Sequence, residues 1–267
     1  MSTVTVYLRL VRVQVRGQVQ YRTSFALSLV GTFLFSALDF ATILILFHNI
    51  PSIAGWSASE VAMLYAASSL SFALSDIVLG SLDRLPVLIR DGSFDMLLIR
   101  PRPAFFHLLA TDFLLRRAGR LIQAVVLLVV TATVFLDVQW TPARVAMLCV
   151  TVLSGAVIAS AVWVIAASVS FWIDEAAEFV NAFTSGAALL AQYPLSIYTA
   201  WLRRLVVFVV PIGFVIYLPL SWIVGKPDSA GLPAAFRFAS PVVAAVTVLV
   251  AAAVWRQSIR RYRSAGG

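Results

Sequence analysis

Long apolar stretches alternate with short polar breaks along almost the whole chain. A helix of about 20 apolar residues is long enough to cross the hydrocarbon core of a bilayer. This pattern predicts an all-α, polytopic membrane protein, with residues 1–267 forming a single transmembrane domain. The six expected membrane-spanning helices are 24–47, 59 or 60 to 82, 115 or 119 to 136, 142–171, 176–195 and 234–255.

The first residues show a different, amphipathic pattern. Apolar residues recur there at helical spacing, and a set of arginines falls on an adjoining face: Val4, Leu8, Val11 and Val15, and Arg9, Arg12 and Arg16. Residues 4–20 are therefore expected to form an interfacial helix that lies on the membrane. The alternative is a basic tail that only sets the orientation of the chain.

The longest polar break separates the second and third expected spans. Between residues 81 and 120 it carries seven arginines: Arg84, Arg90, Arg100, Arg102, Arg116, Arg117 and Arg120. Positive charge next to membrane spans stays in the cytoplasm, so residues 83–106 should form a cytosolic region.

Two short helices are predicted inside this region. Pro86 suits the first turn of one helix, and Gly92 suits its left-handed end. Ser93 or Asp95 can cap the second helix. We expect this second helix to offer apolar side chains for docking, because exposed apolar groups need a partner surface: Phe94, Leu97 and Leu98.

The segment after residue 175 decides the number of spans. If 176–195, 205–224 and 234–255 all crossed, the arginine-rich end of the chain would lie outside the cell, against the charge rule. We expect 176–195 to cross and 198–222 to form an external re-entrant hairpin, broken by Pro211 and Pro219. The competing interpretation makes 205–224 the fifth span. In either case both termini should be cytoplasmic.

Composition and charge exclude several other classes of protein. With 61% hydrophobic and 12% charged residues, the chain has too little polar surface for a soluble domain. The net charge of +8 comes from arginines beside apolar runs, so it does not indicate a nucleic-acid-binding surface. The single cysteine, Cys149, cannot form an internal disulfide.

No motif for catalysis is present. The chain lacks the glycine-rich phosphate loop, and Gly225-Lys226 lacks the earlier glycine that this loop requires. The acids near the fourth span, Asp174, Glu175 and Glu178, have no histidine nearby for a metal site. We therefore predict no catalytic, cofactor-binding or metal residues and no enzymatic activity, so energy must come from a partner or an ion gradient.

Two acids fall within or near the first two spans. Asp39 and Asp76 are expensive in lipid unless they face protein or water. They could form a proton or cation relay, but buried hydrogen bonding or a position at the membrane edge also accounts for them. Small residues nearby are expected to serve helix packing: Ala62, Ala66, Ser69, Ala73, Gly155 and Ala159.

Three segments, in their order along the chain, point to a known family. They are GSFDMLLIRP at 92–101, YPLSIY at 193–198 and VPIGFVIYLP at 210–219. Together with the basic start and the order of spans, they resemble the permeases of bacterial type-2 ATP-binding-cassette exporters. The resemblance covers nearly the whole chain and is closest to the subgroup with paired permeases and a separate ATPase.

The resemblance implies roles for two groups of residues. The cytosolic segment would be the coupling helix that fits a groove on the ATPase, through Gly92, Phe94, Asp95, Leu97, Leu98, Arg100 and Pro101. Residues of the other two segments would cover an external gate: Tyr193, Pro194, Tyr198, Pro211 and Pro219. The helix at 4–20 would be an elbow that also touches the ATPase.

The resemblance also implies an assembly in the bacterial inner membrane. Two permeases, alike or different, would bind two ATPase subunits, which hold the ATP and magnesium, and cargo would pass between the first, second and fifth spans. Such exporters carry drugs, lipids, polysaccharides or peptides. Two other interpretations stay open: an ion-driven secondary transporter that uses Asp39 or Asp76, and a membrane scaffold without transport.

Overall fold

The computed structural model describes residues 22–99, 103–111, 116–173, 176–226 and 231–262. Nearly all of them are helical, and the only β-structure within these ranges is an isolated bridge between Ile53 and Trp56. The predicted all-α class is therefore confirmed. The interfacial helix expected at 4–20 lies outside the described residues.

Six of the described helices are long. They are α2 (Arg22–Asn49), α3 (Ala58–Leu79), α7 (Arg116–Val130), α8 (Pro142–Ser168), α9 (Ala176–Ala191) and α12 (Ser240–Arg261). Shorter helical elements join them: η1 (Gly80–Arg84), α4 (Leu85–Arg90), α5 (Asp95–Leu98), α6 (Ala104–Thr111), η2 (Thr131–Phe135), η3 (Val169–Phe171), η4 (Leu195–Ile197), α10 (Ala200–Arg204), η5 (Leu205–Val209), η6 (Ile212–Phe214), α11 (Tyr217–Ile223) and η7 (Ala234–Phe238).

Length and composition allow several of these helices to cross a bilayer. In the described part of the chain, five stretches qualify: Val30–His48, Ala58–Arg90, Arg117–Phe135, Pro142–Phe171 and Ser240–Arg261. A sixth arises if Ala200–Val209 and Ile212–Ile223, which are bent by 75°, count as one span. Each of the five coincides with one of the expected spans, whereas α9 is apolar but has only 16 residues.

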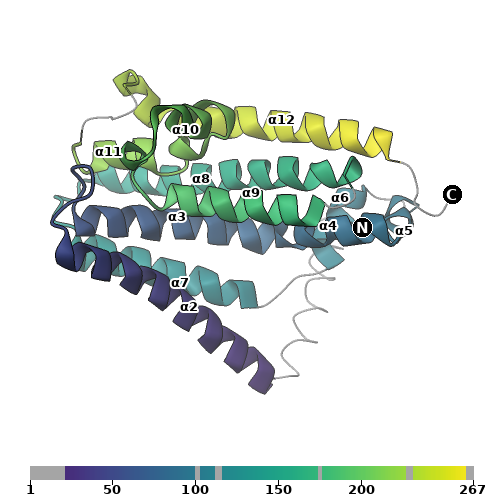
Figure 1. Ribbon diagram of the computed structural model, residues 1–267, viewed down its shortest axis with the longest axis horizontal. Coiled ribbons are helices and arrows are strands. Elements are labelled where there is room, and N and C mark those ends of the chain that lie inside the picture. The colour runs from purple at the N-terminus through teal and green to yellow at the C-terminus, as the bar shows by residue number, and fades with distance from the viewer. Residues whose placement is uncertain (1–21, 100–102, 112–115, 174–175, 227–230, 263–267) are drawn as a thin grey trace.

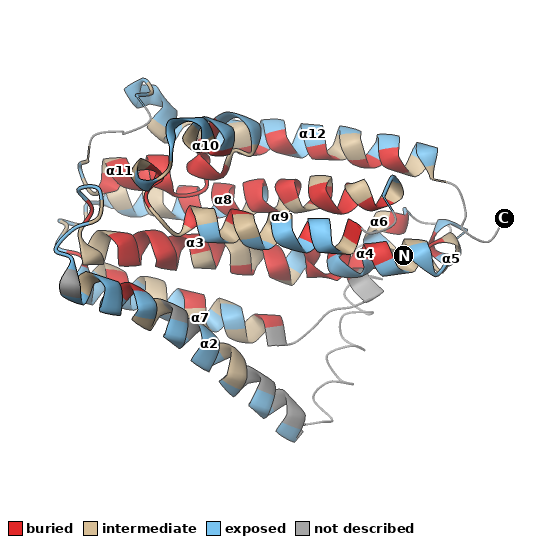
Figure 2. Ribbon diagram, viewed as in Figure 1, coloured by how far each residue is buried: buried red, intermediate tan, exposed pale blue. Residues whose placement is uncertain are grey.

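The helices form an elongated bundle with α3 at its centre (Figure 1). Helix α8 packs on α3 and on α12, α7 packs on another side of α3, and α2 packs on α7 and diverges from it toward its own N-terminal end. Figure 2 shows α3 largely buried, whereas α2 and α12 expose much of their surface. Many of these exposed side chains are apolar, as in Phe35, Leu38 and Leu249, which is the surface that a helix presents to lipid.

Small residues bring α3, α8 and the α11 region together. The Ser71 hydroxyl of α3 donates to the carbonyl of Val152 at 3.1 Å, and Ser160 donates to Ser75 at 3.0 Å. A Cβ on Gly155 would lie 2.7 Å from the carbonyl oxygen of Val215, so the glycine is needed for this approach. The expected packing role of Gly155 is confirmed, as is that of the buried alanines on α3, Ala62, Ala66 and Ala73.

The chain between α9 and α12 folds back at one end of the bundle. It turns at Pro211, between the π-helical turn η5 and η6, and then enters α11, where Leu218 and Leu220 are fully buried. Pro219 fits in α11 because the first N–H groups of a helix have no intrahelical partner. The Ser240 hydroxyl at the start of α12 donates to the carbonyl of Phe214 at 2.7 Å, which fixes the return into the last helix.

The Gly155 contact predicts a difference between two glycine substitutions. Gly155→Ala should destabilise the purified protein by about 1–3 kcal/mol, because backbone atoms must move to admit the new methyl group. Gly186→Ala in α9 should be neutral or slightly stabilising, since a Cβ there meets nothing within 4 Å and alanine favours the helix. Thermal unfolding in detergent measures both; equal effects would contradict the close approach.

Candidate functional site

The second long helix extends beyond the thickness of a membrane. α3, η1 and α4 form one helical stretch, Ala58–Arg90, of 33 residues. At about 1.5 Å per residue it measures about 50 Å, whereas the hydrocarbon core is about 30 Å thick. Part of this stretch must therefore stand outside the hydrocarbon, and the sequence-based expectation of a cytosolic region at 83–106 assigns the excess to the α4 end.

The two short helices predicted for this region are both present. Pro86 lies in the first turn of α4, and Gly92 follows the helix with a φ of 74°, as the sequence predicted. The prediction that Ser93 or Asp95 caps α5 is wrong, because no side chain makes a capping hydrogen bond to that helix. Instead, the hydroxyl and the N–H of Ser93 both donate to Asp91, and these hydrogen bonds lower the pKa of the Asp91 carboxyl.

An aromatic cluster holds α5 against the rest of the chain. It consists of Phe94, Phe105, Phe171, Trp255 and Tyr262. The Phe94 ring lies 5.3 Å from the ring of Phe171 and 5.2 Å from the ring of Tyr262, both edge to face. Phe171 also lies 5.6 Å from Trp255, which is 5.0 Å from Phe105. The cluster thus joins α5 and α6 to the ends of α8 and α12.

Burial divides the residues of α5 into an inner and an outer set. Phe94 is 0% exposed and Leu97 is 7% exposed, so their side chains pack inside the chain. This corrects the expectation that both are available for docking. The outer set is Met96, Leu98 and Ile99, of which Ile99 is 83% exposed.

The acid of α5 faces the end of α12. Partial burial and the neighbouring carboxylate of Asp95 raise the pKa of Tyr262 to about 12, so its phenol keeps its proton at physiological pH. Asp95 thus belongs to the contact that holds α5, and Gly92 to the turn before it. The other two residues expected here, Arg100 and Pro101, lie outside the described residues.

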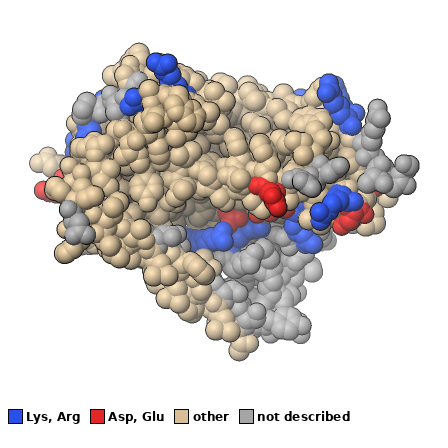
Figure 3. Space-filling view, in the orientation of Figure 1, with Lys and Arg blue, Asp and Glu red and all other residues tan. Residues whose placement is uncertain are grey.

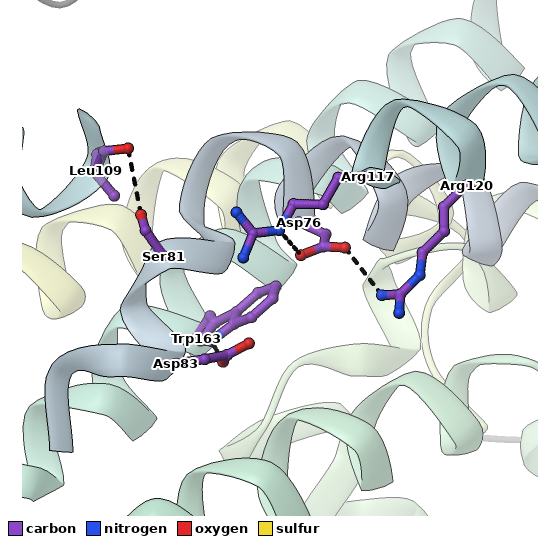
Figure 4. Close-up of polar contacts among 7 residues, drawn as sticks. All are labelled: Asp76, Ser81, Asp83, Leu109, Arg117, Arg120 and Trp163. Atoms are coloured by element: carbon purple, nitrogen blue, oxygen red, sulfur yellow. Dashed lines mark hydrogen bonds and ion pairs between the residues drawn. The ribbon is translucent and has the colours of Figure 1, made fainter. Parts of the chain in front are cut away.

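A charged cluster joins α3 to α7 at the same end of the bundle. Asp76 of α3 pairs with the Nε of Arg117 and with Arg120, each at 3.0 Å. Figure 4 shows the two guanidinium groups on either side of this carboxylate. A Cβ on Gly80 would lie 2.5 Å from Arg117, so the glycine makes room for the pair. Beside them, the indole of Trp163 donates to Asp83 at 3.1 Å.

This cluster lies at one end of a groove between α3, α7, α8 and α9. The groove has a volume of about 380 Å³, and Figure 3 shows basic and acidic side chains together in the hollow beneath α9. Its charged lining consists of Asp76, Asp83 and Arg120. Other lining residues are uncharged and polar or apolar: Tyr65, Ser69, Phe72, Gln123, Leu127, Val162, Asn181, Thr184, Ser185 and Gln192.

The comparison with protein families decides the identity of the chain. The family described as "ABC-2 family transporter protein" matches residues 33–266. The chain belongs to this family. Neither the comparison with curated proteins nor that with solved structures gave a match.

Membership of the ABC-2 family fixes the general class of function. The protein is a multi-pass membrane component of an ATP-binding-cassette transporter, a permease that is not itself catalytic. The family implies partnership with an ATPase of that class. The resemblance inferred from the sequence is thereby confirmed.

A second set of polar contacts lies at the opposite end of this ABC-2 permease. Lys226, after α11, pairs with Glu60 at 2.7 Å, stands 5.4 Å from the ring of Trp56 and donates to the carbonyl of Gly55. Glu60 also accepts from the N–H of Ser57 at 2.7 Å, in a capping box that starts α3. This contact ties the folded-back segment to the second helix.

The five residues expected at an external gate all lie at this end. Pro194 and Pro219 are buried, and Tyr193 packs against the main core. The phenol of Tyr198 donates to the carbonyl of Leu190 at 3.3 Å, and Pro211 marks the bend. The sequence did not identify Lys226, although the pattern Ser57-x-x-Glu60 indicates a capping box from the sequence alone.

The structure accounts for one of the two acids that were expected within or near the first two spans. Asp76 has two cationic partners, so pairing within the protein accounts for its presence. Asp39 belongs to α2, and its side chain is outside the described part of the chain. Among the described residues, no three His, Cys, Asp or Glu side chains are grouped so that they could hold a metal ion.

The burial of α5 predicts how two of its residues respond to truncation. Phe94→Ala should reduce stability by about 3–5 kcal/mol, because it removes a fully buried ring that packs on Phe171 and Tyr262. Ile99→Ala, on the exposed side, should change stability by less than about 0.5 kcal/mol. Thermal unfolding of the two purified variants gives the comparison, and a larger loss in Ile99→Ala would show that α5 is packed the other way round.

The charged cluster predicts an asymmetry between its members. Asp76→Asn should destabilise the protein by about 3–5 kcal/mol, because it removes the charge of the carboxylate that pairs with the buried guanidinium of Arg117. Arg120→Gln should cost much less, since Arg117 still pairs with Asp76 and the Arg120 side chain is 56% exposed. Denaturant or thermal unfolding measures the two losses, which would be about equal if Arg120 were the main partner of Asp76.

Proposed function

We propose that the chain is the membrane-spanning permease subunit of an ATP-driven exporter in the bacterial inner membrane. Two permeases, alike or different, pair with two ATPase subunits, and ATP and magnesium bind to those partners. The observation that carries this proposal is α5, a short helix that follows a stretch longer than the hydrocarbon is thick, is anchored by Phe94 and exposes Met96, Leu98 and Ile99.

The anchoring of α5 supports its role as the coupling helix. A helix of four residues has little stability by itself, so a partner could displace it freely unless other contacts held it. Each edge-to-face aromatic pair contributes about 0.5–1.5 kcal/mol beyond the burial of its area. Through Phe171 and Trp255, a force on α5 would reach α8 and α12, which pack closely together along the bundle.

The arrangement of the helices also supports a six-span layout. In Figure 1, α9 runs from the end that carries α5 to the opposite end, and α12 returns to the α5 end. The segment from η4 to α11, including the expected hairpin 198–222, stays at the opposite end. With α9 as the fifth span, α2 would start on the same side of the membrane as α12 ends, and the arginine-rich end of the chain favours the cytoplasm as that side.

The length of α9 is compatible with this role. Its 16 residues measure about 24 Å, a few Å short of the hydrocarbon core. A short span is accommodated by local thinning of the bilayer at modest cost. The alternative, a span that includes residues 205–224, would have to straighten the 75° bend at Pro211 and remove α11 from its buried position.

Substitution of the exposed apolar residues of α5 tests the proposal. Replacing Met96, Leu98 and Ile99 together by serine should abolish co-purification of the ATPase subunit and change the thermal stability of the permease only slightly, because these side chains are exposed. A matched control replaces Ile197 and Trp201 by serine, which are exposed at the opposite end.

Each result of this experiment has a clear meaning. Loss of the ATPase in the α5 variant alone supports the coupling role. Retention of the ATPase in that variant, or its loss in the control as well, contradicts it. Transport that continues without ATP hydrolysis but stops in Asp39→Asn or Asp76→Asn would instead indicate the ion-driven alternative.

A further inference from the structure

The groove between α3, α7, α8 and α9 has its charges at one end only. Asp76, Asp83 and Arg120 all lie near the α5 end of the bundle. Along the helical stretch that begins at Ala58, Asp76 lies about 27 Å and Asp83 about 38 Å from the start. This depth corresponds to the boundary between hydrocarbon and lipid head groups. The indole N–H of Trp163, bonded to Asp83, lies at the level where tryptophan side chains are enriched in membrane proteins.

The rest of the groove extends away from these charges into the membrane. Further along α3 it is lined by Phe72 and Ser69 and ends near Tyr65, and on the facing helices by Leu127 and Val162. These residues carry no formal charge. On α9 the lining is polar but uncharged, with Asn181, Thr184 and Ser185. The groove therefore matches a molecule with a charged head and an uncharged body, and its volume of about 380 Å³ is within the range of ligand sites.

Of the three charged side chains in the groove, Arg120 and Asp83 can still bind an occupant. Asp76 cannot bind one, because its side chain is only 12% exposed and both of its oxygens are paired. Arg120 uses NH1 for Asp76, but it lines the groove, its side chain is 56% exposed, and a guanidinium has further N–H donors. Asp83 is exposed, and a carboxylate oxygen has more than one acceptor site in addition to the one used by Trp163.

We propose that the groove binds the zwitterionic head of an amphiphilic cargo, with its phosphate or carboxylate on Arg120 and its ammonium on Asp83. An anionic head would be attracted by Arg120 but repelled by Asp83, and a cationic head would meet the opposite pair of effects. Only a head with both charges satisfies both side chains. This inference rests on the proposed function, because it takes the occupant of the groove to be the exported molecule.

Binding of defined amphiphiles to the purified permease tests the groove directly. The probes are a short-chain phosphatidylethanolamine and dodecylphosphocholine, both zwitterionic, and an anionic and a cationic amphiphile of the same chain length. We expect the zwitterionic probes to bind most tightly. Arg120→Gln and Asp83→Asn should each weaken that binding about tenfold, the loss of one charge-assisted contact.

The variants are chosen to keep the fold. Asp83→Asn retains an amide oxygen that can accept from Trp163, and Arg120→Gln leaves the pair of Asp76 with Arg117 in place. Arg204→Gln and Glu178→Gln, exposed and outside the groove lining, are the charge-matched controls and should bind as the parent does. Binding of phosphatidylethanolamine alone would indicate a lipid cargo, and binding of both zwitterionic probes a wider class of amphiphiles.

Several results would overturn the proposal. The zwitterionic head is wrong if the anionic probe binds as tightly and Asp83→Asn has no effect, or if all variants bind every probe equally. In the complex with its ATPase, the zwitterionic probe should also stimulate ATP hydrolysis, and this stimulation should fall in both variants. Binding without stimulation in an active complex would show that the occupant is not cargo. Failure to find an ATPase partner would count against the proposed function, while the binding assay would still decide the groove.

Discussion

A bilayer offers no water to polar groups, so each one at membrane depth must find its partner within the protein. The bundle follows this constraint at every buried polar contact described above. Ser71 and Ser160 bond across the interface between α3 and α8, and Ser240 bonds to the folded-back segment. Arg117, almost completely buried, is paired with Asp76. These pairings determine which helix faces which, because apolar packing alone has little directionality in lipid.

The same constraint separates the two ends of the molecule by their chemistry. At one end, arginines and acids pair between α3 and α7, and the aromatic cluster holds α5 against the ends of α8 and α12. At the other end, Lys226 joins the capping box of α3 to the segment that leaves α11. α3 takes part in both sets of contacts, and it is the most buried of the candidate spans. A rearrangement of α3 would therefore be felt at both ends, which is a requirement for alternating access.

The α5 end illustrates how a short segment could receive a displacement from a partner, as the proposed coupling role requires. The exposed side chains of α5 are few, and its stability comes from Phe94 and Leu97, which face inward. A partner could therefore bind the exposed side chains, while the buried ones transmit a displacement of α5 to the helices that they contact. Packed cores transmit strain because they have few voids and low compressibility.

Much of this protein was determined by its sequence alone. The helical class, five of the spans, the two short helices around Gly92 and the family follow from apolar run length, arginine placement and the order of the proline-containing segments. These features are local along the chain, and therefore a single sequence reveals them. Only the tertiary structure decided four other features. They are the inward position of Phe94, the pairing of Asp76 with Arg117 and Arg120, the contacts of Lys226 with the start of α3, and the groove beneath α9. Each of them depends on residues from different helices, and the rotation of one helix against another is fixed by packing and by polar pairing that no single apolar stretch contains.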